Sequence, residues 1–344
     1  MRSPPAPVAW GIVRVPTAGP RAFNRLALTT MVGLGLLIVS GGLVRLTGSG
    51  LGCPDWPSCA RTSFVGALSF HKDIEFGNRL LSTAISVLVV VTLAAAFRLR
   101  PFRRDLVVPA MRLAAAIVVQ IVIGGLVVLY HLWPPLVMFH FLVSEAMVAV
   151  AVFLYARSRL PEGGSLIPTV STRFLALSRL LVAVTVVVIA IGTAVSGAGP
   201  HGGSRGVRRL PISFRGITEL HATLAAFLAG LVLATLFATS IGDVPPTVIR
   251  RGQALLAAVI VQAGIGYTQY FLKVPAGLVA LHLAGATTVL GAVLWFHLGL
   301  FTHRIDPAAD GEAGLAGRAT SRAARSGPPV IAHSARPTEA QSLM

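Results

Sequence analysis

The sequence predicts an all-α membrane protein with eight transmembrane helices, arranged as two pseudo-symmetric four-helix bundles. Hydrophobic residues make up 54% of the chain and charged residues only 12%, whereas a soluble domain usually carries about 25% charged residues. The charged residues gather in short clusters between long apolar runs, and the two halves share several residues at a constant offset. These three observations predict a parallel repeat, in which one four-helix unit occurs twice.

A membrane-spanning helix needs about 20 apolar residues, and the chain contains eight runs of that length. They lie at about 26–46, 76–97, 108–130, 136–156, 176–197, 217–240, 252–271 and 278–301. The predicted organisation is an N-terminal segment 1–25, a four-helix half 26–156, a linker 157–175, a second half 176–302 and a tail 303–344. The tail is rich in small residues and arginine without apolar periodicity, so we expect it to be disordered.

The arginines predict the orientation of the chain, because cytoplasmic loops of membrane proteins carry an excess of Lys and Arg. Arginines cluster in the connections after the second, fourth and sixth runs. We therefore expect a plasma-membrane protein with both termini in the cytoplasm, although residues 198–216, expected outside, also carry four arginines. The net charge of +17 thus indicates contact with membrane lipid and not nucleic-acid binding.

Five residues of the third and fourth runs recur in the seventh and eighth runs at an offset of 142 residues. The pairs are Gln120/Gln262, Gly124/Gly266, Leu136/Leu278, Val137/Val279 and His140/His282. Further upstream, Asn78 pairs with His221 at an offset of 143. Because each half has an even number of helices, both halves enter and leave on the same side, which predicts an axis along the membrane normal.

His221 and His282 begin the sixth and eighth runs, which cross the membrane in the same direction. Their imidazoles should therefore lie at similar depth, toward the outer face. Ionisable residues inside membrane helices are functional candidates, and two neutral imidazoles can fill both axial positions of a haem iron. The alternative is a pair of polar residues that hydrogen-bond between helices.

The first half resembles the same pocket with one ligand missing, because His140 is matched there by Asn78. An incomplete ligand set suits a site where a molecule reacts or exchanges; alternatively, this half holds no haem. Glu75 lies three residues before Asn78, and positions three apart share a helix face. Its carboxylate could act as a general base or proton carrier, or be an ordinary charge at a helix N-terminus.

Arg45 and Arg79 lie at the outer ends of the first two runs. Guanidinium groups bind haem propionates through paired charged hydrogen bonds, but they also extend toward lipid head groups. Cys53 and Cys59 flank a five-residue outer segment, where a disulfide could close a small loop. A dithiol for electron or thiol exchange stays open as an alternative.

The segments GGLVRLTGSGLGCPDWPSC (41–59) and IEFGNRLLS (74–82) resemble haem A synthases, and the resemblance extends over about residues 25–302. It implies the eight-helix fold and oxidation of a porphyrin methyl group of haem O to the formyl group of haem A, for cytochrome oxidase assembly. It also implies that His221 and His282 ligate a permanent haem b, that His140 belongs to the substrate-haem site and that Glu75 is the essential acid. Cys53 and Cys59 match the family's outer cysteine pair.

The chain departs from this family at Asn78, where a histidine is common. The iron of the first half is then bound by His140 alone, by water or by a loop residue such as His71. A non-catalytic b-type cytochrome that passes electrons from quinol is the alternative function, and a transporter built on a parallel repeat is a third. Direct contact with haem O synthase is an expected partnership, and a homo-oligomer stays open.

Overall fold

The computed structural model describes residues 18–53, 55–59, 69–161, 165–241 and 244–304. One unit of the chain, residues 1–162 and 166–303, holds all eight long helices. The second unit, residues 163–165 and 304–344, has only two described residues, Ser165 and Arg304. The expected disordered tail lies almost entirely outside the described residues and stays a prediction.

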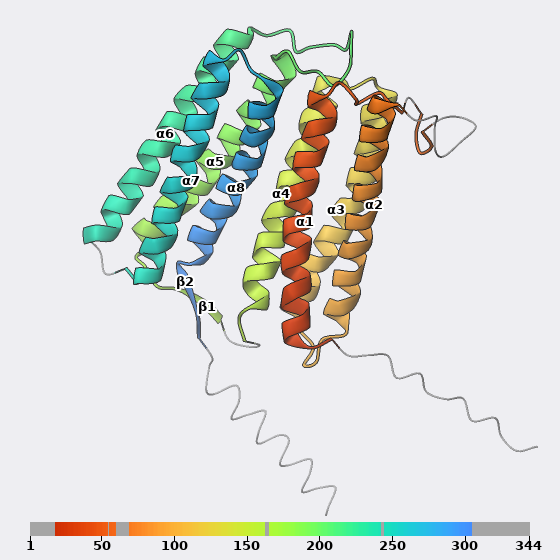
Figure 1. Cartoon of the computed structure of the whole chain (residues 1–344). Helices are drawn as coiled ribbons and strands as arrows, with labels where there is room; N and C mark the ends of the chain where they lie inside the picture. Colours follow the sequence, from red (N-terminus) through yellow and green to blue (C-terminus); the bar gives the residue numbers. More distant parts are fainter. Residues whose placement is uncertain (1–17, 54, 60–68, 162–164, 242–243, 305–344) are drawn as a thin grey trace, which may run out of the picture. The chain divides into compact units, whose positions relative to one another are not determined.

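Eight helices of the described chain are long and apolar enough to cross a membrane, which confirms the predicted fold class (Figure 1). The helices are α1 (Pro20–Leu46), α2 (Phe70–Phe97), α3 (Arg104–Leu129), α4 (Pro134–Ser158), α5 (Thr172–Ala198), α6 (Phe214–Ile241), α7 (Pro246–Phe271) and α8 (Ala276–Leu298). Many large apolar side chains face outward from these helices. The chain is therefore a multi-pass membrane protein, with lipid as the solvent of its outer surface.

The helices begin two to six residues earlier than the apolar runs predicted. The apolar count sees only the part of a helix inside the hydrocarbon, whereas the polar first turns continue the helix into the interface. Proline occupies the first turn of α1, α4 and α7, where its missing N–H costs no hydrogen bond. Residues 20–25, expected to precede the first helix, are consequently helical.

The sequence reasoning missed two short strands, β1 (Ser165–Pro168) and β2 (Phe301–Arg304), which form a two-stranded sheet. The backbone N–H of Thr169 donates to the carbonyl of Leu300 at 2.8 Å beside this sheet. Four-residue strands are too short to give a recognisable alternation of polar and apolar residues. The eighth run was expected to continue to residue 301, but α8 ends at Leu298.

The two sets of four helices pack in the same pattern. In the first set α1 contacts α2 and α4, while α3 contacts the same two helices; α5 and α7 contact α6 and α8 in the same way. Buried apolar side chains form one cluster in each set. The sets meet through α1 with α8, α4 with α5, and α4 with α8. Since α4 and α8 are equivalent elements, a two-fold repeat axis passes between them.

The repeat extends to the backbone of the outer turns. His131 and Leu132, between α3 and α4, have φ of 51° and 60°, and Lys273 and Val274, between α7 and α8, have φ of 60° and 61°. Positive φ is uncommon for residues other than glycine, so two such pairs at an offset of 142 residues reflect the repeat and not coincidence. The turns that precede the two outer-side histidines therefore have the same construction.

Candidate functional site

His221 of α6 and His282 of α8 lie beside each other on the side of the membrane where α2, α4, α6 and α8 all begin (Figure 1). Their ring centroids are 6.2 Å apart, and the ring planes are inclined at 70°. The Nδ1 atom of each ring is buried and has no hydrogen-bond partner among the described residues. Buried polar atoms are normally paired, so these nitrogens indicate a site for a ligand.

Each of these imidazoles packs against a glycine on a neighbouring helix. A Cβ at Gly192 of α5 would lie 3.0 Å from Cε1 of His221, and a Cβ at Gly266 of α7 would lie 3.0 Å from Cε1 of His282. Such a contact is closer than carbon atoms normally approach. The two glycines thus set the positions of the rings by leaving room for them.

The first half repeats this construction around His140 of α4. The side-chain amide of Gln120 donates to the His140 carbonyl at 3.0 Å, as that of Gln262 donates to the His282 carbonyl at 2.9 Å. The Nδ1 atom of His140 is also buried without a hydrogen-bond partner among the described residues. The histidine-bearing helices of both halves are therefore tied to their neighbours by the same amide contact.

Asn78 of α2 holds the position that a second histidine holds in the other half. Its side-chain carbonyl accepts a hydrogen bond of 2.9 Å from the Ser40 hydroxyl of α1. His71, the loop residue considered as a substitute ligand, lies within hydrogen-bond distance of the Ser49 hydroxyl, with 3.0 Å between Nδ1 and Oγ. Both side chains thus already have polar partners on or just after α1.

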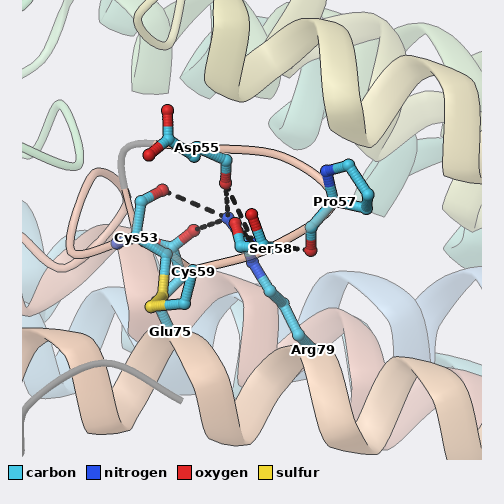
Figure 2. Close-up of a disulfide and its surroundings, with 7 residues drawn as sticks. All are labelled: Cys53, Asp55, Pro57, Ser58, Cys59, Glu75 and Arg79. Carbon is cyan, nitrogen blue, oxygen red and sulfur yellow. Dashed lines mark hydrogen bonds and ion pairs between the residues drawn. A yellow bond between two sulfur atoms is a disulfide. The ribbon is translucent and has the colours of Figure 1, made fainter. Parts of the chain in front are cut away.

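Glu75 of α2 is buried, with 5% of its surface exposed, and both of its carboxylate oxygens have partners. Oε2 accepts the backbone N–H of Cys53 at 2.7 Å, and Oε1 lies 2.7 Å from Nη2 of Arg79 (Figure 2). A buried carboxylate needs such partners because an isolated charge is costly away from water. The carboxylate is therefore held at the junction between α2 and the cysteine loop.

The cysteine loop, residues 53–59, is closed by the Cys53–Cys59 disulfide, which confirms that prediction. Arg79 holds the same loop from below, as Figure 2 shows. Its guanidinium donates to the carbonyls of Cys53, Asp55 and Ser58 at 3.2 Å and to that of Pro57 at 3.4 Å. Its predicted partner was a haem propionate, and these carbonyl contacts could not be read from the sequence.

Arg45 also bonds to main-chain carbonyls. Its Nε atom donates to the His201 carbonyl at 2.7 Å and its Nη2 atom to the Ser196 carbonyl at 2.6 Å. Next to it, the Gly50 N–H donates to the Gly203 carbonyl at 2.8 Å. The outer end of α1 is thereby joined to the end of α5 and the loop that follows it.

Sequence reasoning missed Glu145 of α4, which is 4% exposed. Its Oε1 atom accepts a 2.7 Å hydrogen bond from the Thr287 hydroxyl of α8, and its Oε2 atom is buried without a partner among the described residues. Glu145 and Thr287 are themselves separated by 142 residues, so they are equivalent positions in contact across the repeat axis. A lone carboxyl inside an apolar run was the signal that could have found it.

The clamp by Arg79 predicts how the disulfide reacts. Both cysteines are buried, at 0% and 3% exposed, so reduction requires the loop to open. Replacing Arg79 with methionine removes charged hydrogen bonds worth about 1.5 kcal/mol or more each, so we expect reduction by dithiothreitol to become roughly tenfold faster. Mass spectrometry after alkylation measures the rate in mild detergent.

Arg215→Met is the matched control, because Arg215 forms the same i, i+4 ion pair with Glu219 but is 82% exposed and far from any disulfide in sequence. Its reduction rate should equal that of the wild type. Equal rates in the wild type and Arg79→Met would show that Arg79 does not hold the loop closed.

The eight spans and the buried histidines at related outer-side positions define a polytopic helical membrane protein with a ligand site inside its bundle. A protein-family model described as cytochrome oxidase assembly protein, COX15-CtaA, matches residues 24–200, just over half of the chain. The chain belongs to this family.

Several curated relatives carry the name heme A synthase. The protein of Geobacillus kaustophilus is 34% identical over 99 residues, which cover 28% of this chain and 30% of the relative. Proteins of Bacillus cereus and Bacillus anthracis are 28% identical over 135 residues, which cover 39% of this chain and 43% of each relative. The chain thus aligns with less than half of the length of these relatives.

Proposed function

We propose that the chain is a haem A synthase, a membrane oxidoreductase that oxidises a methyl group of haem O to the formyl group of haem A for cytochrome oxidase assembly. The observation that carries the proposal is the pair of facing imidazoles, His221 and His282, in one half, with a related single-histidine site in the other. One half would then keep a cofactor, and the other would exchange substrate for product. The names of the relatives agree with this function.

The histidine pair fits a haem iron. With a metal–nitrogen bond of about 2.0 Å and about 1.1 Å from ring nitrogen to ring centre, two imidazoles on opposite sides of one metal have centres about 6 Å apart. The observed separation is 6.2 Å. Within the described ranges, no three His, Cys, Asp or Glu side chains converge as a bare metal ion would need. A haem needs only axial ligands from the protein.

In the proposed mechanism, His221 and His282 hold haem b, which supplies one-electron transfer when bound. His140 binds the iron of haem O in the first half, and Asn78 lines the opposite side of that pocket. Glu75 holds or moves a proton at its carboxylate oxygens beside the substrate. The cysteine loop keeps this carboxylate in place through the Cys53 N–H.

The positive charges of Arg45 and Arg79 lie at the outer rim of the first half, where we propose that they attract the propionates of the substrate. Their hydrogen bonds to main-chain carbonyls fix both guanidinium groups in position. A preorganised guanidinium loses less side-chain entropy on binding an anion than a mobile one. This role therefore adds to the observed contacts and does not replace them.

The complete histidine pair also favours a second candidate, a b-type cytochrome that only passes electrons from quinol. The disulfide loop and the buried Glu75 have no part in that function, which is why we place the enzyme first. We further propose a plasma-membrane location with both termini in the cytoplasm, so that the two sites lie near the outer face. Haem O synthase is the proposed donor of the substrate.

Extraction of haems after co-expression with haem O synthase tests the proposal. The full chain is purified in mild detergent, and its haems are separated by chromatography. Haem A together with haem b is the expected result. Haem b with unconverted haem O would mean that oxidation fails, haem b alone would favour the cytochrome, and no haem would contradict both functions.

The glycine beside His282 gives a specific prediction for haem b. Gly266→Ala adds a methyl group 3.0 Å from the His282 ring, whereas a methyl group added at Gly264, two residues earlier on α7, meets nothing within 4 Å. We expect Gly266→Ala to weaken haem b retention roughly tenfold or more, as displaced ligand supports do at metal sites. Haem content per chain, measured by pyridine haemochrome, should fall.

Gly264→Ala is the control, and it should retain haem at the wild-type level. Alanine is a better helix former than glycine by about 1 kcal/mol, so poor helix formation cannot explain a loss in Gly266→Ala. Full haem content in both variants would contradict the assigned position of the ring.

A further inference from the structure

Glu145 lies at the same depth beneath both histidine sites. It follows His140 by five residues on α4, and its partner Thr287 follows His282 by five residues on α8. At about 1.5 Å of rise per residue, both side chains start about 7.5 Å deeper in the membrane than the histidines. The contact between them therefore links the two histidine-bearing helices near the middle of the bundle.

The carboxyl of Glu145 is only half satisfied. Oε1 accepts from the Thr287 hydroxyl at 2.7 Å, while Oε2 is buried and has no partner among the described residues. An ionised carboxylate in this position lacks the counter-charge that normally accompanies a buried charge. Oε2 is consequently an atom at which a proton can be held.

No opposite charge lies near Glu145 on the described helices that pack against α4, which are α1, α3, α5 and α8. Apart from the two histidines nearer the outer face, the ionisable residues of these five helices lie toward the helix ends. They are Arg21, Arg25 and Arg45 of α1, Arg104, Asp105 and Arg112 of α3, Tyr155 and Arg157 of α4, Arg173 and Arg179 of α5, and His297 of α8.

We propose that Glu145 takes up a proton when the haem held by His221 and His282 is reduced, so that electron entry adds no net charge to the bundle interior. This inference rests on the proposed function. An external one-electron reductant converts iron(III) to iron(II), and one proton from water converts the Glu145 carboxylate to the carboxylic acid at Oε2. Reoxidation of the iron releases that proton.

Electrostatics gives the direction and size of this coupling. An added electron at a separation on the order of 10 Å, in an effective dielectric of about 20, raises the proton affinity of a carboxylate roughly tenfold. Glu145 has no cation of its own among the described residues to dilute this effect. Its contact with Thr287 places it between the helix of the substrate site and the helix of the haem b site, so it can respond to either.

A redox titration of the full-length, haem-loaded protein at several pH values tests the proposal. In the wild type, the midpoint potential of the low-spin haem should fall as pH rises, by up to about 59 mV for each tenfold change in proton concentration. Glu145→Gln, which keeps the size and the Thr287 contact, should remove this dependence. Glu145→Asp should restore it, and Thr287→Val should shift the pH window while keeping the slope.

An equal slope in the wild type and Glu145→Gln, or no slope in the wild type, would overturn the proposal. Infrared difference spectra of the wild type, reduced minus oxidised, give a test that needs no variant: a protonated-carboxyl band should appear on reduction, and its absence would also overturn the proposal. A wild type without haem would instead mean that the proposed function fails. The two failures are thus distinguishable.

Discussion

Replacing His282 with alanine is expected to remove the low-spin haem spectrum of the purified protein, and His221→Ala should do the same. The two rings face each other at 6.2 Å, and loss of either leaves the iron without one axial ligand. Haem b content should fall from one per chain to background or to a five-coordinate, high-spin remainder. Reduced-minus-oxidised optical spectra and pyridine haemochrome measure both quantities.

His297→Ala is the matched control for this result. His297 lies on the same helix, α8, but at its opposite end, and its Nδ1 atom is 2.9 Å from the Ser178 hydroxyl of α5. Its replacement should leave the low-spin spectrum unchanged. A wild-type spectrum in both His221→Ala and His282→Ala would remove the histidine pair from the site.

Glu75→Gln is expected to retain haem b and to lower haem A production by about 10²- to 10⁴-fold, the usual contribution of a general acid or base. Glutamine keeps an oxygen that can accept the Cys53 N–H, so the cysteine loop should stay closed, but it cannot carry the proton. Haem A and haem O extracted after co-expression with haem O synthase give the ratio of product to substrate.

Two further measurements separate a chemical role of Glu75 from a structural one. Asp73→Asn, an exposed acid on the same helix, should leave the product ratio at the wild-type value. The rate of disulfide reduction in Glu75→Gln should match the wild type if the loop is intact. Normal haem A production in Glu75→Gln would exclude Glu75 from the chemistry.

The spans, the repeat and the outer-side histidines could be predicted from the sequence, because each depends on length or spacing along one helix. The eight apolar runs set the helix number, and the offset of 142 residues placed His140 and His282 in equivalent turns. The contacts of Arg45 and Arg79 could not be predicted, since their acceptors are main-chain carbonyls of loops that carry no sequence signal. The two strands were missed for the related reason that they are too short to show a pattern.

The partner of Glu145 illustrates what a repeat can reveal only in three dimensions. Glu145 and Thr287 occupy equivalent positions but differ in chemistry, so a search for shared residues passes over both. Their contact follows from the packing of α4 against α8 on the repeat axis. Residues at which the halves differ, such as Asn78 and His221, are where we expect the two sites to differ in function.

The central claim is that the second half holds one haem between His221 and His282. Electron paramagnetic resonance of the full chain, purified from a host without haem O synthase, tests it most directly. We predict one low-spin haem per chain with a bis-imidazole signal. Protein that contains no haem, or only a high-spin five-coordinate haem, would contradict it.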